Sequence, residues 1–414
     1  MEIKNDAIVF GILIAILAII FITASSSNKY LKKFYTYVPP LLLCYFVPGL
    51  LNWPLGIVSP ENSQLYFVAS RYLLPASLVL FCLSIDLKGV FNLGPKALIM
   101  FFAATFSIVI GAPIALGVTS LLFPELKHAM PGEEIWRGLS TIAGSWIGGG
   151  ANQTAMKEIY HCSDSLFSSM IIVDVLVANI WMGVLLFGAG RYHKIDKMLK
   201  ADNSSIDELK TKVENYRASI AKIPNTTDLF VILAIGFGAT ALAHFAADFI
   251  APRMKEHINF LQRYNLNSFA SGFFWLIVIA TTIGVALSFT KLKRYEGAGA
   301  SRFGSVFIYI LVATIGMKMN LLEAFSNPQF FLIGIIWMLV HITILLIIAK
   351  LIKAPFFFVA VGSQANIGGA ASAPIVASAF STALAPVGVL LAVLGYALGT
   401  YAAIVSTQLM QWIF

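Results

Sequence analysis

Charged residues are scarce in this sequence. Asp, Glu, Lys and Arg make up 12% of its 414 residues, whereas hydrophobic residues make up 58%. A water-soluble domain of this length needs more charged groups on its surface, so the composition excludes a soluble protein. It indicates a polytopic membrane protein, whose helices expose apolar side chains to membrane lipid.

Cysteines and the common catalytic signatures are also lacking. The spacing of Cys44, Cys82 and Cys162 matches neither a zinc site nor a disulfide framework, so we interpret them as small apolar side chains in helices. The sequence has no phosphate-binding loop with Gly-Lys-Ser/Thr and no cluster of carboxylates, and we expect no cofactor. Basic cytoplasmic loops explain the net charge of +8, so we expect no nucleic-acid partner.

Long apolar stretches predict roughly ten membrane-spanning helices. The first stretch is longer than the apolar part of a signal peptide, and Glu2 and Asp6 precede it, so we interpret it as a span. We place the spans at about 7–25, 36–58, 65–85, 97–122, 165–189, 228–251, 268–289, 303–318, 329–349 and 385–409. Residues 252–264 could form a surface helix.

Two polar, glycine-rich segments interrupt membrane-length apolar stretches, one in each half of the chain. The first runs from Gly144 to Ala155 and the second from Gly362 to Ala373. Lipid offers no hydrogen-bond partners, so irregular backbone at membrane depth survives only inside protein or beside an aqueous cavity. A matched pair of such breaks is typical of a transport site.

The distribution of Lys and Arg predicts that each glycine-rich segment is a re-entrant hairpin, at about 138–160 and 355–380. With hairpins and an outer N-terminus, loops 26–35, 86–96, 190–226, 290–302 and 350–354 face the cytoplasm, and they carry most of the basic residues. If each segment spanned once, the basic loops 190–226 and 290–302 would face outside. Lys127, Arg137 and Lys157 near the first hairpin fit the hairpin arrangement less well.

The hairpin arrangement gives two halves of inverted topology. We therefore predict an all-α polytopic membrane protein in which each half has five spanning helices and one re-entrant hairpin. The first repeat is 1–189, the polar loop is 190–226 and the second repeat is 227–414. At an offset of 218 residues, Gly144, Ser145, Gly150 and Ala155 match Gly362, Ser363, Gly368 and Ala373. Ser205 and Glu208 predict a helix start within the polar loop.

The hairpin tips supply the predicted substrate site. Glycine permits close backbone approach, neutral side chains offer donors and acceptors, and helix N-termini can hold a carboxylate. Packing of small residues between helices is the alternative, although packing does not require Asn and Gln beside three consecutive glycines. The predicted substrate-binding residues are Ser145, Gly148, Gly149, Gly150, Asn152, Gln153, Thr154, Ser363, Gln364, Asn366, Gly368, Gly369 and Ser372.

Asp174 is a carboxylate within an apolar run, just after the first hairpin. Such a group costs about 2.5–3.5 kcal/mol to insert into a membrane, so it needs a partner or an ion. We predict a cation site at Asp174 and Asn179, with Na⁺ at Asp174, Asn152 and Asn366. The alternative is a structural pair between Asp174 and a buried base such as Arg71.

Other functions remain open from the sequence. Ser145 with His244 or His341 could form an intramembrane serine protease, but two copies of the segment favour a symmetric pathway over a single nucleophile. We therefore predict no enzymatic activity. A proton-coupled carrier, a channel and a membrane-embedded sensor are the further alternatives.

The segments Gly148–Ala155 and Gly362–Gly369 resemble those of the YjcL-like bacterial membrane proteins, a family of unknown function. They are more distantly similar to those of the sodium–glutamate symporters and the 2-hydroxycarboxylate transporters. This wider resemblance implies inverted five-helix repeats, a homodimer in the bacterial inner membrane, and elevator-like transport of a small organic anion with Na⁺. The anion could be an amino acid, a hydroxy acid or a short peptide. Asn152-Gln153-Thr154 replaces the histidine, glycine and threonine of the glutamate symporters.

Overall fold

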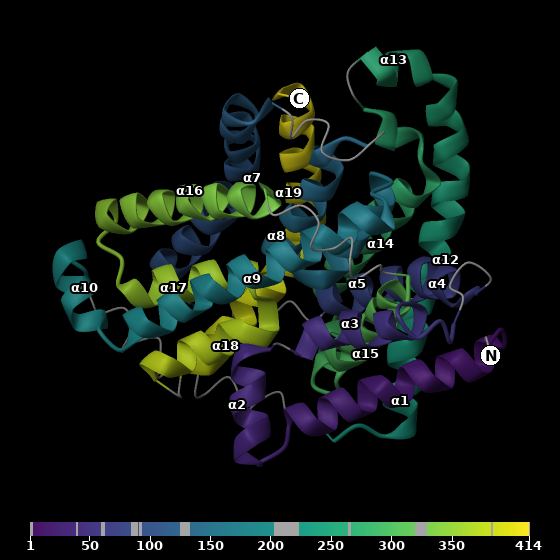
Figure 1. The fold of residues 1–414 in the computed structure, drawn as a ribbon, viewed down its shortest axis with the longest axis horizontal. Helices are drawn as coiled ribbons and strands as arrows, with labels where there is room; N and C mark the ends of the chain where they lie inside the picture. The colour runs from purple at the N-terminus through teal and green to yellow at the C-terminus, as the bar shows by residue number, and fades with distance from the viewer. Residues whose placement is uncertain are drawn as a thin grey trace.

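The computed structural model is built from helices (Figure 1). It describes residues 3–38, 40–58, 63–83, 90, 93–124, 133–202, 223–263, 266–318, 329–381 and 384–413. Within these residues the pairing of extended backbone is limited to an isolated bridge between Ile3 and Val58. The predicted all-α polytopic membrane protein is thereby confirmed. The predicted helix start at Ser205 lies outside the described residues.

Seven described helices are long and apolar enough to cross a membrane. They are Asp6–Ala24 (α1), Leu65–Leu83 (α4, η2 and α5 together), Pro95–Leu122 (α7), Asp164–Ala189 (α9), Thr226–Glu256 (α12), Gln329–Leu351 (α16) and Val387–Ile413 within α19 (Ala385–Ile413). The other three predicted spans coincide with shorter apolar helices, α3 (Pro40–Asn52), α14 (Gly272–Ser288) and α15 (Ala300–Gly316). Within the predicted surface segment, residues 252–256 continue α12, and residues 258–263 form α13 (Ile258–Arg263).

The first glycine-rich segment folds back on itself. Helix α8 (Ile135–Ile159) is broken at Gly149, whose φ of 75° and ψ of −175° are not helical. At the open end, Arg137 Nη1 donates a 2.6 Å hydrogen bond to the carbonyl of Tyr160. Along a straight helix, which rises 1.5 Å per residue, Arg137 and Tyr160 would lie roughly 34 Å apart. The two arms therefore form a helical hairpin with Gly149 at its tip.

The second glycine-rich segment makes a matching hairpin from α17 (Phe356–Ile367) and α18 (Gly369–Phe380). The turn lies at Gly368 and Gly369, and Gly369 has a φ of +57°. At the open end the rings of Phe357 and Phe380 are 5.3 Å apart. The positive-φ glycines of the two tips, Gly149 and Gly369, thus differ by 220 residues rather than the 218 of the sequence alignment.

The two hairpins open at opposite ends of α9. The open end of the first lies beside the start of α9, where Glu133 accepts a hydrogen bond from the Ser163 backbone. The open end of the second lies beside α10 (Tyr192–Leu199), where Tyr192 is 5.7 Å from Phe380. With 26 residues, α9 separates these ends by about 39 Å. The tips meet between them, because both Gly149 and Gly369 approach the Tyr396 ring.

The start of α7 and the end of α9 lie at the same end of the molecule. Lys96 Nζ is 2.9 Å from Asp202 Oδ2, and the Asp202 backbone donates to the carbonyl of Lys353. This arrangement requires the segment between α7 and α9 to return to the side from which it started, as a hairpin does. The sidedness of the hairpins across a membrane stays a prediction.

The helices divide into two groups (Figure 1). We call α7, α8, α9, α16, α17, α18 and α19 the hairpin group, because each contacts another member closely. We call α1, α3, α4 (Leu65–Val68), η2 (Ala69–Leu73), α5 (Leu74–Leu83), α12, α14 and α15 the scaffold group. The groups meet where α19 lies against α5 and α14, with Tyr396 stacked on Phe81 at 4.5 Å.

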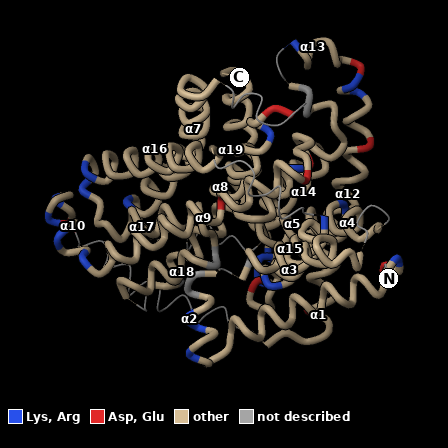
Figure 2. Tube along the Cα trace, viewed as in Figure 1, with Lys and Arg blue, Asp and Glu red and all other residues tan. Residues whose placement is uncertain are grey.

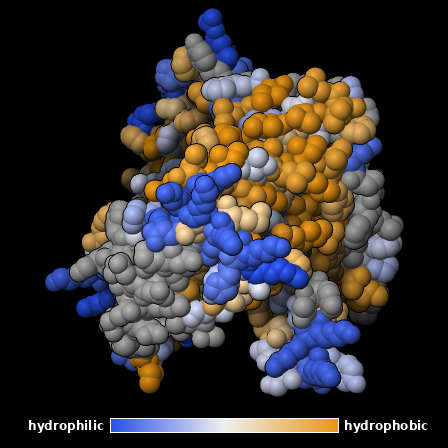
Figure 3. Space-filling model, turned by 90° about the vertical axis from the view of Figure 1, so that its left-hand side faces the viewer, coloured by the Kyte–Doolittle hydropathy of each residue, from blue (hydrophilic) through white to orange (hydrophobic). Residues whose placement is uncertain are grey.

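Charge and hydropathy on the surface fit a membrane protein. Charged residues gather at helix ends and on α10, α13 and α2 (Lys29–Tyr37), and the central helices carry few (Figure 2). One face of the molecule presents a broad hydrophobic area bordered by hydrophilic groups (Figure 3). Large apolar side chains such as Ile180, Phe187 and Phe245 are mostly exposed, as lipid-facing residues are.

Candidate functional site

A cavity of about 390 Å³ lies at the hairpin tips, between the two helix groups. The hairpin group lines it with the tips of both hairpins and with the middle of α9. The scaffold group contributes Phe21 of α1, Pro40 of α3 and Tyr309 of α15, and Tyr35 of α2 completes that wall. The volume falls within the range of small-molecule sites, and the mixture of an apolar wall with a few polar groups is typical of them.

Asp174 is the charged group among the described residues that line this cavity. It is the eleventh residue of α9, and 6% of its surface is exposed. Trp146 Nε1 donates to its Oδ1 at 2.6 Å, and Gln153 Nε2 donates to its Oδ2 at 2.9 Å. Ser145 also lines the cavity beside this carboxylate. Both hydrogen-bond donors come from the first hairpin, so the tip of that hairpin is built around this carboxylate.

The two asparagines of the tips have the same local role. Each donates through Nδ2 to a carbonyl four residues earlier, Asn152 to Gly148 at 2.8 Å and Asn366 to Gly362 at 3.0 Å. Each accepts through Oδ1 from a threonine hydroxyl of the other half of the chain. Thr400 donates to Asn152 at 2.5 Å, and Thr105 donates to Asn366 at 2.8 Å. The asparagines therefore fix the two hairpins to α19 and α7.

A buried hydrogen-bonded chain holds the first arm of the second hairpin. His341 Nδ1 is 2.7 Å from the Ser107 hydroxyl, and its Nε2 is 2.7 Å from the Ser363 hydroxyl. Trp181 Nε1 also donates to Ser363, at 2.8 Å. All four residues lie in the hairpin group, on α16, α7, α17 and α9. His341 thus contacts serines other than Ser145, and His244 contacts the carbonyl of Arg71.

The structure brings only some of the predicted site residues to the cavity. Those that line it are Ser145, Gly149, Gly150, Asp174, Asn179, Gln364, Gly368 and Ser372. Gln153 reaches Asp174, whereas Thr154 bonds to the carbonyl of Gly150. Gly148 packs against Gly399, and Gly369 lies beside the Tyr396 hydroxyl. Ser363, Asn152 and Asn366 are held in the contacts described above. The predicted Na⁺ ligands Asp174, Asn152 and Asn366 therefore do not share one site in this structure.

Three residues with clear roles were absent from the predicted site. Trp146 donates to Asp174, and Thr105 and Thr400 fix the two asparagines. Trp146 lies inside the glycine-rich segment, and its indole N–H is a hydrogen-bond donor. It could therefore have been predicted as a partner for the buried acid Asp174. Arg71 pairs with Glu158 at 3.2 Å, so the alternative ion pair between Arg71 and Asp174 is not formed.

The geometry can accommodate an anion and a cation together. The helical arms that follow the breaks begin at Gly150 and Gly369, and helix N-termini carry about half a positive charge. Gly150 lines the cavity, and so do Ser372 and Gly368, the residue before Gly369. A carboxylate would find donors there, while a cation would find Asp174 on α9. The Gln364 side chain also lines the cavity, and its amide nitrogen bonds to Ser372 at 2.8 Å.

Comparison with known proteins identifies the family and a relative of the chain. The protein family described as "Protein of unknown function (DUF819)" matches residues 11–413. The chain is 23% identical over 367 residues to the "Uncharacterized membrane protein YjcL" of Bacillus subtilis (strain 168), over 86% of this chain and 85% of that protein. These matches confirm the predicted resemblance to the YjcL-like bacterial membrane proteins.

Proposed function

We propose that this chain, which belongs to the DUF819 family of proteins of unknown function, is a secondary active transporter of a small organic anion. One observation carries the proposal. Two hairpins that open at opposite ends of α9 bring their glycine tips together at a cavity lined by Asp174. Paired helix breaks of opposite direction around one polar site are the arrangement that many transporters use for alternating access.

The charge of the cavity supports coupling to a cation. Asp174 gives the cavity lining a negative charge, and the described residues that line the cavity include neither Lys nor Arg. An organic anion would be repelled by this carboxylate until a cation neutralised it. Binding of the cation therefore favours binding of the anion, and the converse holds by thermodynamic linkage. We propose Na⁺ as the cation, with Asp174 as its carboxylate ligand and Asn179 as a second oxygen donor.

The substrate we propose is an amino acid, a hydroxy acid or a short peptide. Its carboxylate would lie at the helix N-termini near Gly150 and Gly369, with Ser145 and Ser372 as hydroxyl partners. Its apolar part would contact the opposite wall, formed by residues such as Phe21 and Tyr309. A cavity of about 390 Å³ is suited to a ligand of this size.

The position of the cavity favours an elevator-like movement. The polar groups belong to the hairpin group, and the scaffold group supplies mainly apolar and aromatic contacts. The loaded hairpin group can therefore carry its ligands along the scaffold as one unit. We propose that the protein works in this way as a homodimer in the bacterial inner membrane, as a carrier rather than an enzyme.

The proposal is tested by uptake into proteoliposomes. Radiolabelled amino acids and hydroxy acids are offered at fixed pH with and without an inward Na⁺ gradient. We expect saturable uptake that needs Na⁺ and that Asp174→Asn reduces at least tenfold. The matched control is Asp248→Asn, because Asp248 is an exposed acid on another apolar helix, α12.

The same assay separates the alternatives. A pH gradient that drives uptake without Na⁺ would replace the proposed coupling ion with a proton. Current that does not saturate with substrate would indicate a channel. Uptake that is equal in wild type and Asp174→Asn, with the same Na⁺ dependence, would refute the role of Asp174.

A further inference from the structure

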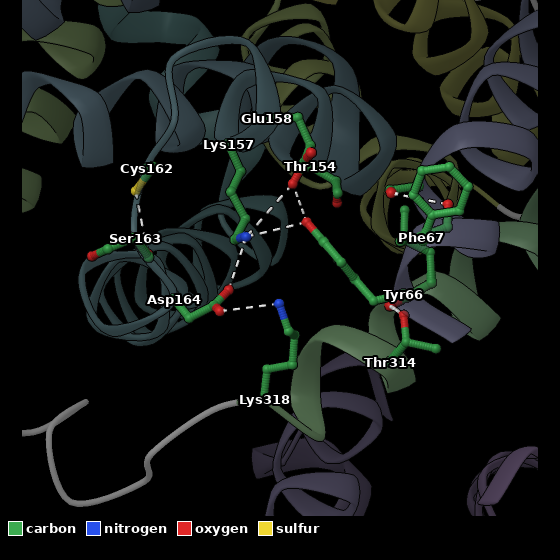
Figure 4. A network of polar contacts seen from close by, with 12 residues as sticks. Tyr66, Phe67, Thr154, Lys157, Glu158, Cys162, Ser163, Asp164, Thr314 and Lys318 are labelled. Carbon is green, nitrogen blue, oxygen red and sulfur yellow. Dashed lines mark hydrogen bonds and ion pairs between the residues drawn. The ribbon is translucent and has the colours of Figure 1, made fainter. Parts of the chain in front are cut away.

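A network of charged side chains joins the two helix groups at one end of the molecule (Figure 4). From the hairpin group come Lys157 and Glu158 of α8 and Asp164 of α9. From the scaffold side come Tyr66 of α4, Arg71 of η2 and Lys318, two residues beyond the end of α15. This network lies outside the cavity, and the proposed transport site does not use it.

Four hydrogen bonds and ion pairs of the network cross between the groups. Lys318 Nζ is 3.4 Å from Asp164 Oδ2, and Arg71 Nη2 is 3.2 Å from Glu158 Oε2. The Tyr66 hydroxyl donates to Glu158, and Lys157 Nζ donates to that hydroxyl at 3.1 Å. Lys318 also lies over the Tyr66 ring, 4.4 Å from its centre. Tyr66 is therefore the centre of the junction.

The network can separate without leaving a buried charge alone. Lys157 is 5% exposed, but its closest acid, Asp164 at 2.9 Å, belongs to the same helix group, as does Glu158 at 3.7 Å. The two cations on the scaffold side are more accessible, with side chains 30% exposed at Arg71 and 26% at Lys318. Breaking a pair is most costly when it strands a buried charge, and here neither side is stranded.

The network lies away from the cytoplasmic end that the sequence predicts. Asp164 begins α9, whereas Asp174 is one-third of the way along it, about 15 Å further. The cavity wall on the scaffold side includes Phe21 and Pro40, which flank the predicted cytoplasmic loop 26–35, and Tyr35, which ends it. The contacts around Tyr66 thus join the groups on the other side of the ligand site.

We propose that Tyr66, Arg71 and Lys318 form a releasable latch that holds the hairpin group in the position seen here. The latch rests on the proposed function, because it has a purpose only if the hairpin group moves. Its release would let the first hairpin leave the scaffold and open the cavity toward the end where α9 begins. The latch therefore sets the ratio of the two transport states.

The test measures access to the cavity from each side. Ala178 lines the cavity, and the native cysteines Cys44, Cys82 and Cys162 are buried, so Ala178→Cys provides one reactive thiol. Membrane-impermeant maleimide is applied to proteoliposomes of known orientation. In this background we expect Lys318→Met or Arg71→Met to raise the labelling rate from the α9-start side about fivefold. A change of this size corresponds to the stabilisation that a partly exposed ion pair provides.

Controls separate the latch from general loosening. Lys318→Arg should restore the original labelling rate, because it keeps the charge beside Asp164. Lys350→Met removes an exposed lysine at the end of α16 and should change nothing. Size-exclusion chromatography establishes that each variant is folded before it is labelled.

The outcomes of labelling and uptake are independent. Unchanged or slower labelling from the α9-start side in both Met variants would overturn the latch, and transport would stand if the same vesicles show Na⁺-driven uptake. Faster labelling without uptake of any probe would keep the latch as a conformational lock and overturn the proposed transport. Faster labelling with uptake supports both.

Discussion

The Trp146 indole donates a 2.6 Å hydrogen bond to Asp174, and this contact ties the tip of the first hairpin to α9. Both residues are almost fully buried, and the carboxylate also lines the cavity. Any cation that reaches Asp174 therefore acts on the hairpin as well as on α9. The contact gives a direct route from ion binding to the shape of the substrate site.

Trp146→Phe should destabilise the protein by about 1–3 kcal/mol, because a buried carboxylate loses a hydrogen-bond donor. The loss should be smaller in Na⁺, since a bound cation compensates part of the uncovered charge. Thermal unfolding of the purified protein in Na⁺ and in choline measures both effects. Trp275→Phe is the matched control, because Trp275 donates to the neutral carbonyl of Phe269 away from the cavity. Equal behaviour of the two variants would contradict a special role for Trp146.

The turn of the first hairpin should not tolerate a side chain at Gly149. Its φ of +75° and ψ of −175° lie in a region open almost only to glycine, which costs a residue with a Cβ roughly 1–3 kcal/mol and strains the cavity wall. We expect Gly149→Ala to abolish uptake while the protein still inserts in the membrane. Gly183→Ala on α9 is the control, because that position has no positive φ and an added Cβ would meet nothing within 4 Å. Full uptake by Gly149→Ala would show that the observed turn is not needed.

The contact between the first hairpin and α19 depends on small residues. A Cβ on Gly399 would lie 2.5 Å from the Cα of Gly148, so Gly399→Ala must push α19 and the hairpin apart. Overpacking of this kind costs about 1–3 kcal/mol, and it should also weaken the nearby bond from Thr400 to Asn152. Gly238→Ala on α12 meets nothing within 4 Å and serves as the control. A thermal shift that is the same for both variants would rule out close packing at Gly399.

The sequence was sufficient for features that depend on hydropathy and local backbone chemistry. The apolar runs predicted the helices, and the glycine-rich segments predicted both breaks, because glycine is the residue that adopts a positive φ without strain. Asp174 was recognisable as a lone acid in an apolar run.

Long-range contacts were not readable in the same way. The oxygens of Asn152 and Asn366 were predicted to bind Na⁺, but hydroxyls from Thr400 and Thr105 occupy them in this structure. Those threonines lie on helices far along the chain, and no local spacing links them to the hairpins. The pairing of Arg71 with Glu158 is likewise set by packing of α8 against the scaffold group.

His341 should be required for the packing of the second hairpin. It joins the hydroxyls of Ser107 and Ser363, so His341→Leu leaves two buried polar groups without that partner and should cost roughly 1–3 kcal/mol for each. A double-mutant cycle tests the link, because Ser107→Ala should be costly alone but nearly neutral beside His341→Leu. The free energy of unfolding in a mixed-micelle denaturation provides the measurement. His244→Leu is the control, since His244 is only half-buried and contacts one backbone carbonyl. If the two substitutions were additive, Ser107 and His341 would act independently, and the hydrogen-bonded chain would not extend from α7 to the hairpin.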